Sequence, residues 1–149
     1  MTYTFTNAQI RSILNGMGFK KRGTNEPNFP ISEDNSSLGD ELTKQAIKSF
    51  QSYFKLTPDG IVGDQTKMAF EKAMNVLHNE LDIVMKPNPP LRPQEPVYGL
   101  QTAQAVANFR KRYGFEPNGN PNDDRVADQP MRLRLAELTT GKTVEVSGT

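Results

Sequence analysis

Apolar residues recur at helical spacing through residues 43–84, the most regular part of the chain. In its first part Ala46, Ile47, Phe50 and Phe54 share one face, while lysine, glutamine and serine cover the other face. A second stripe of the same period consists of Thr66, Ala69, Phe70, Ala73, Leu77, Leu81 and Val84. This pattern predicts two amphipathic helices, the second about twenty residues long and ending before Pro87.

A tight turn is predicted between these helices. Pro58 presets φ, the Asp59 side chain can bond the backbone two residues on, and Gly60 accepts a positive φ. We therefore expect the chain to reverse direction here.

The residues after the turn lead into the second helix. Ile61 and Val62 are apolar residues at the bend, and we expect them to fill the space between the helices. Gly63 or Asp64 is expected to cap the second helix, where an acidic residue suits the positive helix start.

A shorter helix is predicted upstream, with Asn7 as its N-cap and its end near Met17. Residues 20–37 are polar and contain glycine, proline, asparagine and serine, which is typical of a long surface loop. The next helix is expected to open at Thr43, with Asp40 placed to cap it.

The chain reads AIKSFQ at residues 46–51 and LTPDGIVGDQT at residues 56–66. These strings resemble the signature of the peptidoglycan-binding domain family, A-V-x-x-F-Q followed by G-L-x-x-D-G-I-V-G-x-x-T, and Lys55 stands where the family usually has glycine. The resemblance implies a small three-helix module, usually noncatalytic, of the kind attached to cell-wall hydrolases or phage endolysins. The motif residues, for which we expect architectural roles, are Phe50, Asp59, Gly60, Ile61, Val62, Gly63 and Thr66.

The second half of the chain echoes the first. An offset of 59 residues sets Phe109 on Phe50, and an offset of 64 residues sets Leu81 on Met17. The second copy then uses the end of the long helix as its own first helix. This favours a loop inside the repeat, rather than a linker, for the proline-rich residues 87–96.

The predicted fold class is therefore all-α, with two degenerate three-helix copies that share a long central helix. The first copy is expected at residues 1–84 and the second at residues 74–138, with a last helix starting near Pro130. The alternating residues 139–149 predict either a frayed tail or a short terminal strand that pairs with residues 3–6.

Composition narrows the function. The chain has 149 residues, no cysteine and a net charge of +1, so disulfides and thiolate metal sites are excluded, and nucleic acid and membranes are not expected as partners. The first twenty residues hold no apolar run of signal-peptide length, which predicts a cytoplasmic chain as written, whereas the resemblance implies the cell envelope.

Candidate chemistry is sparse. His78 is the only histidine, lies mid-helix among polar residues and is expected to be solvated. Asp59 and Asp64 lack the alternating ligands of a calcium loop because Ile61 interrupts them, so no metal and no cofactor is predicted. The acidic residues form no pair in an apolar setting of the kind that glycosidases use, so we do not expect an enzyme.

A wall polymer offers hydroxyls, amides and carboxylates, so a receptor needs a shallow groove with aromatic surface, amide side chains and cations. Gln51, which we expect to be exposed, and Tyr53 are the candidate ligand-binding residues of the first copy. Tyr98, Arg110 and Arg112 are those of the second copy.

An alternative for the cluster of residues 110–113 is a basic and aromatic patch for nucleic acid, but three charges in a neutral chain favour a solvated face.

The resemblance implies noncatalytic recognition of peptidoglycan or a related cell-wall glycan, with a separate cell-wall hydrolase as a further partner. One alternative is a cytoplasmic protein-interaction scaffold that kept the fold without the glycan. Another is an accessory to a cell-wall hydrolase or endolysin with residual activity.

Overall fold

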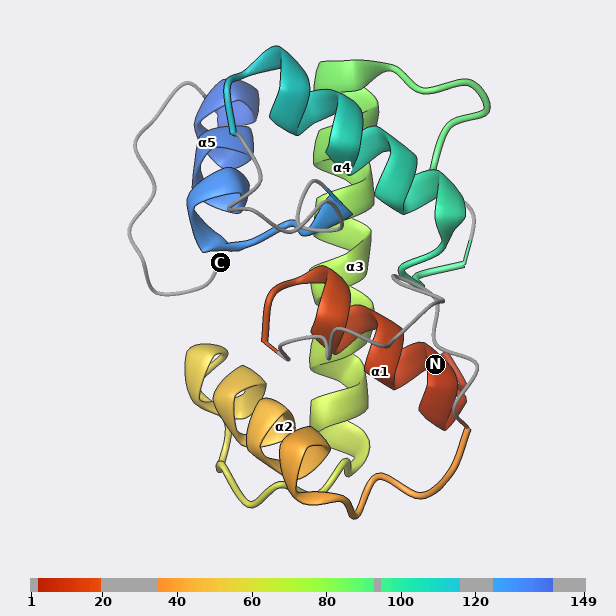
Figure 1. Ribbon diagram of the computed structural model, residues 1–149, viewed down its shortest axis with the longest axis vertical. Coiled ribbons are helices and arrows are strands. Elements are labelled where there is room, and N and C mark those ends of the chain that lie inside the picture. Colours follow the sequence, from red (N-terminus) through yellow and green to blue (C-terminus); the bar gives the residue numbers. More distant parts are fainter. Residues whose placement is uncertain (1–2, 20–34, 93–94, 116–124, 141–149) are drawn as a thin grey trace.

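The computed structural model describes residues 3–19, 35–92, 95–115 and 125–140. Within these ranges it contains helices and no strand, which confirms the all-α prediction. The helices are α1 (Asn7–Gly16), α2 (Glu41–Tyr53), α3 (Asp64–Met85), α4 (Leu100–Arg112) and α5 (Gln129–Thr140). Helix α3 runs through the middle of the molecule, with α1 and α2 around one end and α4 and α5 around the other (Figure 1).

The helix starts follow from capping side chains, and one predicted cap is wrong by a residue. Thr6, not Asn7, caps α1, because its hydroxyl accepts from the Gln9 N–H while the Gln9 side chain accepts from the Thr6 N–H. Asp40 caps α2 as predicted, and Gly63 occupies the cap position of α3.

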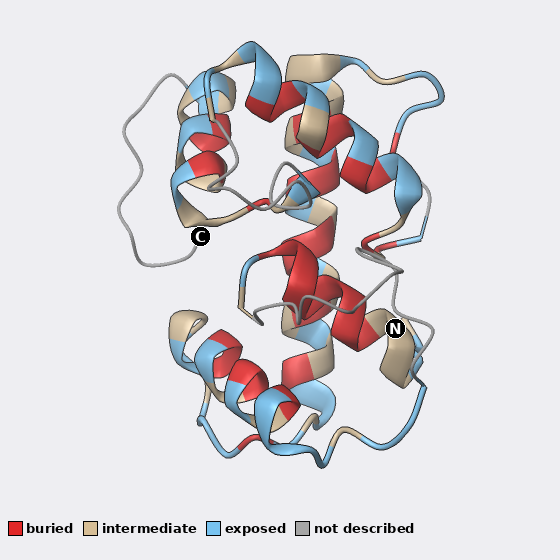
Figure 2. Cartoon of the chain, viewed as in Figure 1, coloured by how far each residue is buried: buried red, intermediate tan, exposed pale blue. Residues whose placement is uncertain are grey.

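The core forms where the stripes of the helices meet α3, so buried residues gather on its sides toward α1, α2, α4 and α5 (Figure 2). Phe50 of α2 stacks on Phe70 of α3, with ring centroids 4.2 Å apart. Between the two ends, α1 packs against Tyr98, whose ring would lie 2.5 Å from a Cβ placed on Gly16. Only glycine at position 16 allows this approach, and it joins the two ends of the molecule into one core.

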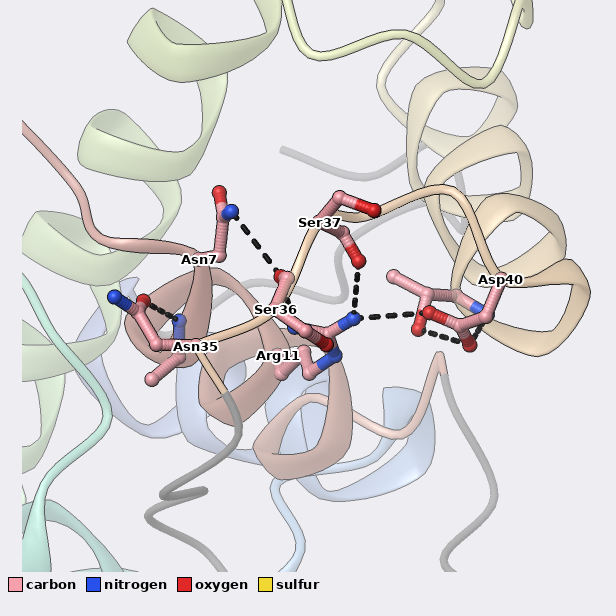
Figure 3. Close-up of polar contacts among 8 residues, drawn as sticks. Asn7, Arg11, Asn35, Ser36, Ser37 and Asp40 are labelled. Carbon is pink, nitrogen blue, oxygen red and sulfur yellow. Dashed lines mark hydrogen bonds and ion pairs between the residues drawn. The ribbon is translucent and has the colours of Figure 1, made fainter.

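A buried arginine ties α1 to the start of α2 (Figure 3). Arg11, only 4% exposed, donates to the carbonyl oxygens of Ser36 and Ser37 at 2.8 and 2.7 Å and to Asp40 Oδ1 at 2.9 Å. Partial burial raises the pKa of Asp40, but hydrogen bonds from Thr43 and Arg11 outweigh it and lower that pKa to about 2. The cap of α2 is therefore a charged group held in place by α1.

Helices α2 and α4 end in the same way, 59 residues apart. Lys55 and Gly114 both have positive φ, 61° and 79°, and the N–H that follows each donates to the carbonyl of Gln51 or Arg110, at 2.7 and 2.8 Å. The left-handed conformation at Lys55 explains why glycine suits this position in the family signature. The shared ending agrees with the predicted offset, although the duplication itself and the copy boundaries at residues 84 and 138 stay predictions.

Several predicted segments fall partly outside the described residues. The loop at residues 20–37 is described only from residue 35, and the tail only at Thr139 and Thr140, which end α5. Residues 3–6 belong to no helix or strand. None of the described helices combines the length and apolarity needed to cross a bilayer.

Candidate functional site

Gln51 lies inside the molecule, so the expectation that it is exposed is wrong. Its side chain is 1% exposed, and its amide nitrogen donates to Asp59 Oδ1, Ile61 O and Thr66 Oγ1 at 3.0, 3.0 and 3.1 Å. Its amide oxygen accepts from the Gly60 N–H at 2.9 Å. Gln51 therefore holds the turn against the helices on either side, and it offers a ligand no surface.

The turn has the predicted geometry at Asp59 and Gly60. Asp59 Oδ1 accepts from the Ile61 N–H at 2.9 Å, two residues on, and Gly60 has φ +75°. The hydrogen bond from the Ile61 backbone, followed by that from Gln51, lowers the pKa of Asp59. Asp59 and Gly60 therefore stabilise the turn.

The predicted hydrophobic plug is wrong at Ile61. Its side chain is 68% exposed, because the turn directs the Ile61 carbonyl, rather than the side chain, toward Gln51. Val62 is partly buried against the core.

Two candidates of the second half are also buried. Tyr98 is 1% exposed, and its hydroxyl donates to the Arg125 carbonyl. Arg110 is 4% exposed and donates to Val126 O at 3.1 Å and Asp128 Oδ1 at 3.3 Å, so it does not belong to a solvated face as predicted. Arg112 is exposed on α4, where it lies over the Tyr113 ring.

His78 is buried, so the prediction of a solvated residue is wrong. Its side chain is 2% exposed, and Nε2 lies 2.8 Å from Thr102 Oγ1 of α4. Burial lowers the pKa of His78 to about 4, with Arg92 acting in the same direction and Asp82 against it. The ring is therefore neutral at pH 7 and serves the α3–α4 contact.

Of the predicted ligand-binding residues, Tyr53 lines a cavity in the described part of the chain. The cavity, which we call the α2–α3–α5 hollow, has a volume of about 440 Å³. It lies between the end of α2, the middle of α3, and α5. Helices α2 and α5 are on the same side of α3 (Figure 1). Its lining residues are Met17, Tyr53, Phe54, Lys55, Ala69, Lys72, Ala73, Val76, Leu77, Glu80, Arg132, Leu133 and Ala136.

Arg132 supplies a positioned cation on the α5 side of this hollow. Its guanidinium lies over the Tyr53 ring at 5.0 Å and over the Phe19 ring at 5.4 Å, and its Nε donates to Ala127 O at 2.9 Å. Burial lowers the pKa of Arg132, with contacts to Tyr53 opposing the change. An arginine remains charged under such conditions, so it presents a fixed positive charge.

The hollow also contains one carboxylate. Burial raises the pKa of Glu80, whereas a hydrogen bond from Thr139 Oγ1 at 3.2 Å acts in the opposite direction.

A second, more open concavity adjoins the hollow across the exposed edge of α3. This α3 groove has a volume of about 410 Å³ and is lined by Met68, Glu71, Lys72, Asn75, Val76, Asn79 and Arg92. Lys72 and Val76 line both cavities, so the two form one continuous surface. Across the described ranges, no three histidine or acidic side chains gather in a way that could hold a metal ion.

Comparison with known families bears on the first of these cavities. Residues 8–70 match the model of the family described as "Putative peptidoglycan binding domain". Over these residues the chain is similar to the peptidoglycan-binding domain family. The match confirms the resemblance carried by the strings at residues 46–51 and 56–66, and it does not extend to a second copy. No curated protein and no solved structure matches the chain.

The residues that match the family supply only part of the surface just described. Tyr53, Phe54, Lys55 and Ala69 fall inside the match, whereas Arg132 comes from a helix beyond it. The sequence analysis missed Lys72 and Arg132. Lys72 lies on the polar side of the α3 stripe, so the sequence pattern could have identified it. No local signal in the sequence places Arg132 against Tyr53, which lies 79 residues earlier.

Proposed function

We propose that this protein binds peptidoglycan, or a related cell-wall glycan, without hydrolysing it. The observation that carries the proposal is the family match over residues 8–70, because domains of that family are binding modules. The surface across α3 supports it, because aromatic, amide and cationic side chains line two connected cavities, as recognition of such a polymer requires.

The placement of carboxylates supports the noncatalytic part of the proposal. The two acidic residues that line the cavities, Glu71 and Glu80, are nine positions apart on α3. At 1.5 Å per residue they are separated by about 13 Å along the helix axis. Glycosidases hold their carboxyl pair within about 10 Å, so these two are too far apart to share one glycosidic bond.

The binding residues that we propose differ from those predicted. Tyr53 remains a candidate, and Lys72, which borders both cavities and is exposed, joins it. Gln51, Tyr98 and Arg110 are left out because they are buried.

Sedimentation with purified insoluble sacculi tests the proposal. The wild-type protein should pellet with the sacculi at low salt, and Tyr53→Ala with Lys72→Ala should lower the retained fraction without changing helical circular dichroism. Lys111→Ala is the matched control, since Lys111 is an exposed lysine on α4 that lines neither cavity.

Other results would favour the alternatives. A protein that stays in the supernatant and fractionates with cytosol would refute binding and favour an interaction scaffold. Loss of turbidity from the suspension would show hydrolysis. A wall hydrolase that is retained only when this protein is present would be identified as a partner.

A further inference from the structure

We propose that the α2–α3–α5 hollow binds the peptide part of the wall polymer, as a short segment with small apolar side chains and a free carboxylate, rather than its sugar chain. This inference rests on the proposed function and names the chemical unit that the deeper of the two cavities takes.

The charge of the hollow suits an anion. Lys55, Lys72 and Arg132 line it, against one acidic residue, Glu80, so that at full ionisation the lining carries 3 − 1 = 2 positive charges. The whole chain has a net charge of only +1, which shows that positive charge is concentrated at this place. A carboxylate gains charge-assisted hydrogen bonds from such a lining, whereas an uncharged sugar does not need them.

The walls of the hollow suit small apolar side chains. The other nine lining residues are apolar or aromatic, and three of them, Ala69, Ala73 and Ala136, are alanines that leave room near the helix backbones. Methyl-sized groups placed there lose contact with water at a gain of roughly 25 cal/mol per Å² of apolar surface. A sugar ring, with a hydroxyl on most of its carbons, would leave those hydroxyls unpaired against such walls.

The aromatic surface of the hollow is already in use. A sugar binds an aromatic side chain by stacking on an open ring face, but Arg132 lies over the Tyr53 ring at 5.0 Å. Phe19 and Phe54 also approach Tyr53 edge to face, with centroids 5.5 and 4.9 Å away. The ring therefore serves to position the guanidinium, which can pair with a carboxylate through its planar set of donors.

The adjoining α3 groove offers what a sugar chain needs. Asn75 and Asn79 present amides there, and the groove joins the hollow at Lys72 and Val76. A polymer of sugars with peptide branches can thus place its chain along the groove while a branch enters the hollow.

Arg132 makes this assignment depend on the part of the chain beyond the family match. It lies on α5, and it also closes the hollow toward α1 by approaching Met17 O at 3.5 Å. Residues 8–70 by themselves would supply four of the nine apolar lining residues and Lys55, without Lys72 or the guanidinium.

The test compares three forms of wall material with the full chain: intact sacculi, glycan strands stripped of peptide by an amidase, and the released peptides. We expect the protein to sediment with intact sacculi and to bind the free peptides in titration calorimetry. Stripped strands immobilised in an affinity gel should retard it much more weakly, because they occupy the α3 groove alone. Peptides whose terminal carboxylate is converted to an amide should bind about tenfold more weakly, the equivalent of one charge-assisted contact.

Variants locate the site. Lys55→Gln with Lys72→Gln should weaken peptide binding about tenfold, Lys111→Gln should leave it unchanged, and Arg132→Lys should restore part of what Arg132→Gln loses. Arg132 is packed between aromatic rings. If Arg132→Gln does not fold, Lys55→Gln with Lys72→Gln still tests the site, because it removes two of the three positive charges of the lining.

Equal retention on intact and stripped material, unaffected by the lysine variants, would overturn the peptide assignment and leave the proposed function standing. Retention on neither material would overturn both.

Discussion

Acidification should destabilise this protein through His78, and the size of the effect follows from its burial. His78 is 2% exposed, and its pKa is lowered from 6.5 to about 4. The folded-state pKa lies below the unfolded one, so between pH 6.5 and pH 4 the unfolded chain binds a proton that the folded protein rejects. Stability from this source is complete above pH 6.5 and is lost as the pH falls toward 4.

Linkage between these two pKa values gives a loss of about 2 kcal/mol between pH 7 and pH 5, and about 3 kcal/mol in total below pH 4. A domain of this size has a stability of roughly 5–15 kcal/mol, so the loss is easily measured. With a urea dependence of about 2 kcal/mol per M, the unfolding midpoint should drop by about 1 M between pH 7 and pH 5.

Urea unfolding followed by circular dichroism at several pH values measures the effect. His78→Gln keeps a polar group facing Thr102 but has no proton to bind, so its midpoint should change much less over the same range. Burial raises the pKa of Glu80, so this residue adds stability as the pH falls. It does so equally in the wild type and in His78→Gln. The matched control combines His78→Gln with Asn79→His, which moves the histidine one position to an exposed site where its pKa does not change on folding.

Parallel pH profiles for wild type and His78→Gln would refute the reasoning, because they would show that the buried ring accepts a proton as easily as the unfolded one. A steep profile for the control would refute it as well, since that histidine is solvated in both states.

Two further predictions concern the turn. Gln51→Ala should lower the free energy of unfolding by about 3 kcal/mol, because it leaves buried partners at the turn unpaired, whereas the exposed Gln45→Ala should change it by less than about 0.5 kcal/mol; equal urea midpoints would contradict the contacts of Gln51. Gly60→Ala should cost about 1–2 kcal/mol, because φ is +75° and a new Cβ would lie 3.2 Å from Lys48 Cε, while Gly63→Ala meets no atom within 4 Å and should be tolerated in the same urea unfolding assay.

The sequence was sufficient for α1, α2 and α3, because each carries an apolar stripe that period alone reveals. The 22-residue α3 and the Asp40 cap of α2 are the clearest cases. Helix existence depends on local spacing and on caps a few residues away, both of which can be read directly from the chain.

The same reasoning failed for polar residues that sit inside the stripe. His78 follows Leu77 and lies four residues after Met74 and three before Leu81, a position that places it on the buried face. Its polar neighbours Asn79 and Glu80 suggested solvent, but the turn of the helix carries them away from the buried face. Position on the face, rather than residue type, was the better guide.

Burial of Gln51 and Arg110 required tertiary information. Both extend the buried face of a helix by one position because a later segment folds over them, residues 59–61 in one case and 126–128 in the other. Nothing in the helix itself reports that a segment eight or more residues later will supply the hydrogen-bond partners. The α2–α3–α5 hollow was beyond the sequence for the same reason, because it exists only where three separate helices meet.

Helix α3 continues to Met85, fifteen residues after the family match ends at Phe70. A fragment cut at that boundary would keep only the first two turns of this helix, too short to hold its shape in water, and would lose Met74 and Leu77 from the middle of the core. The residues that match the family and the residues that fold together therefore differ in this chain. Residues 8–70 cannot be moved into another protein without the second half of the chain.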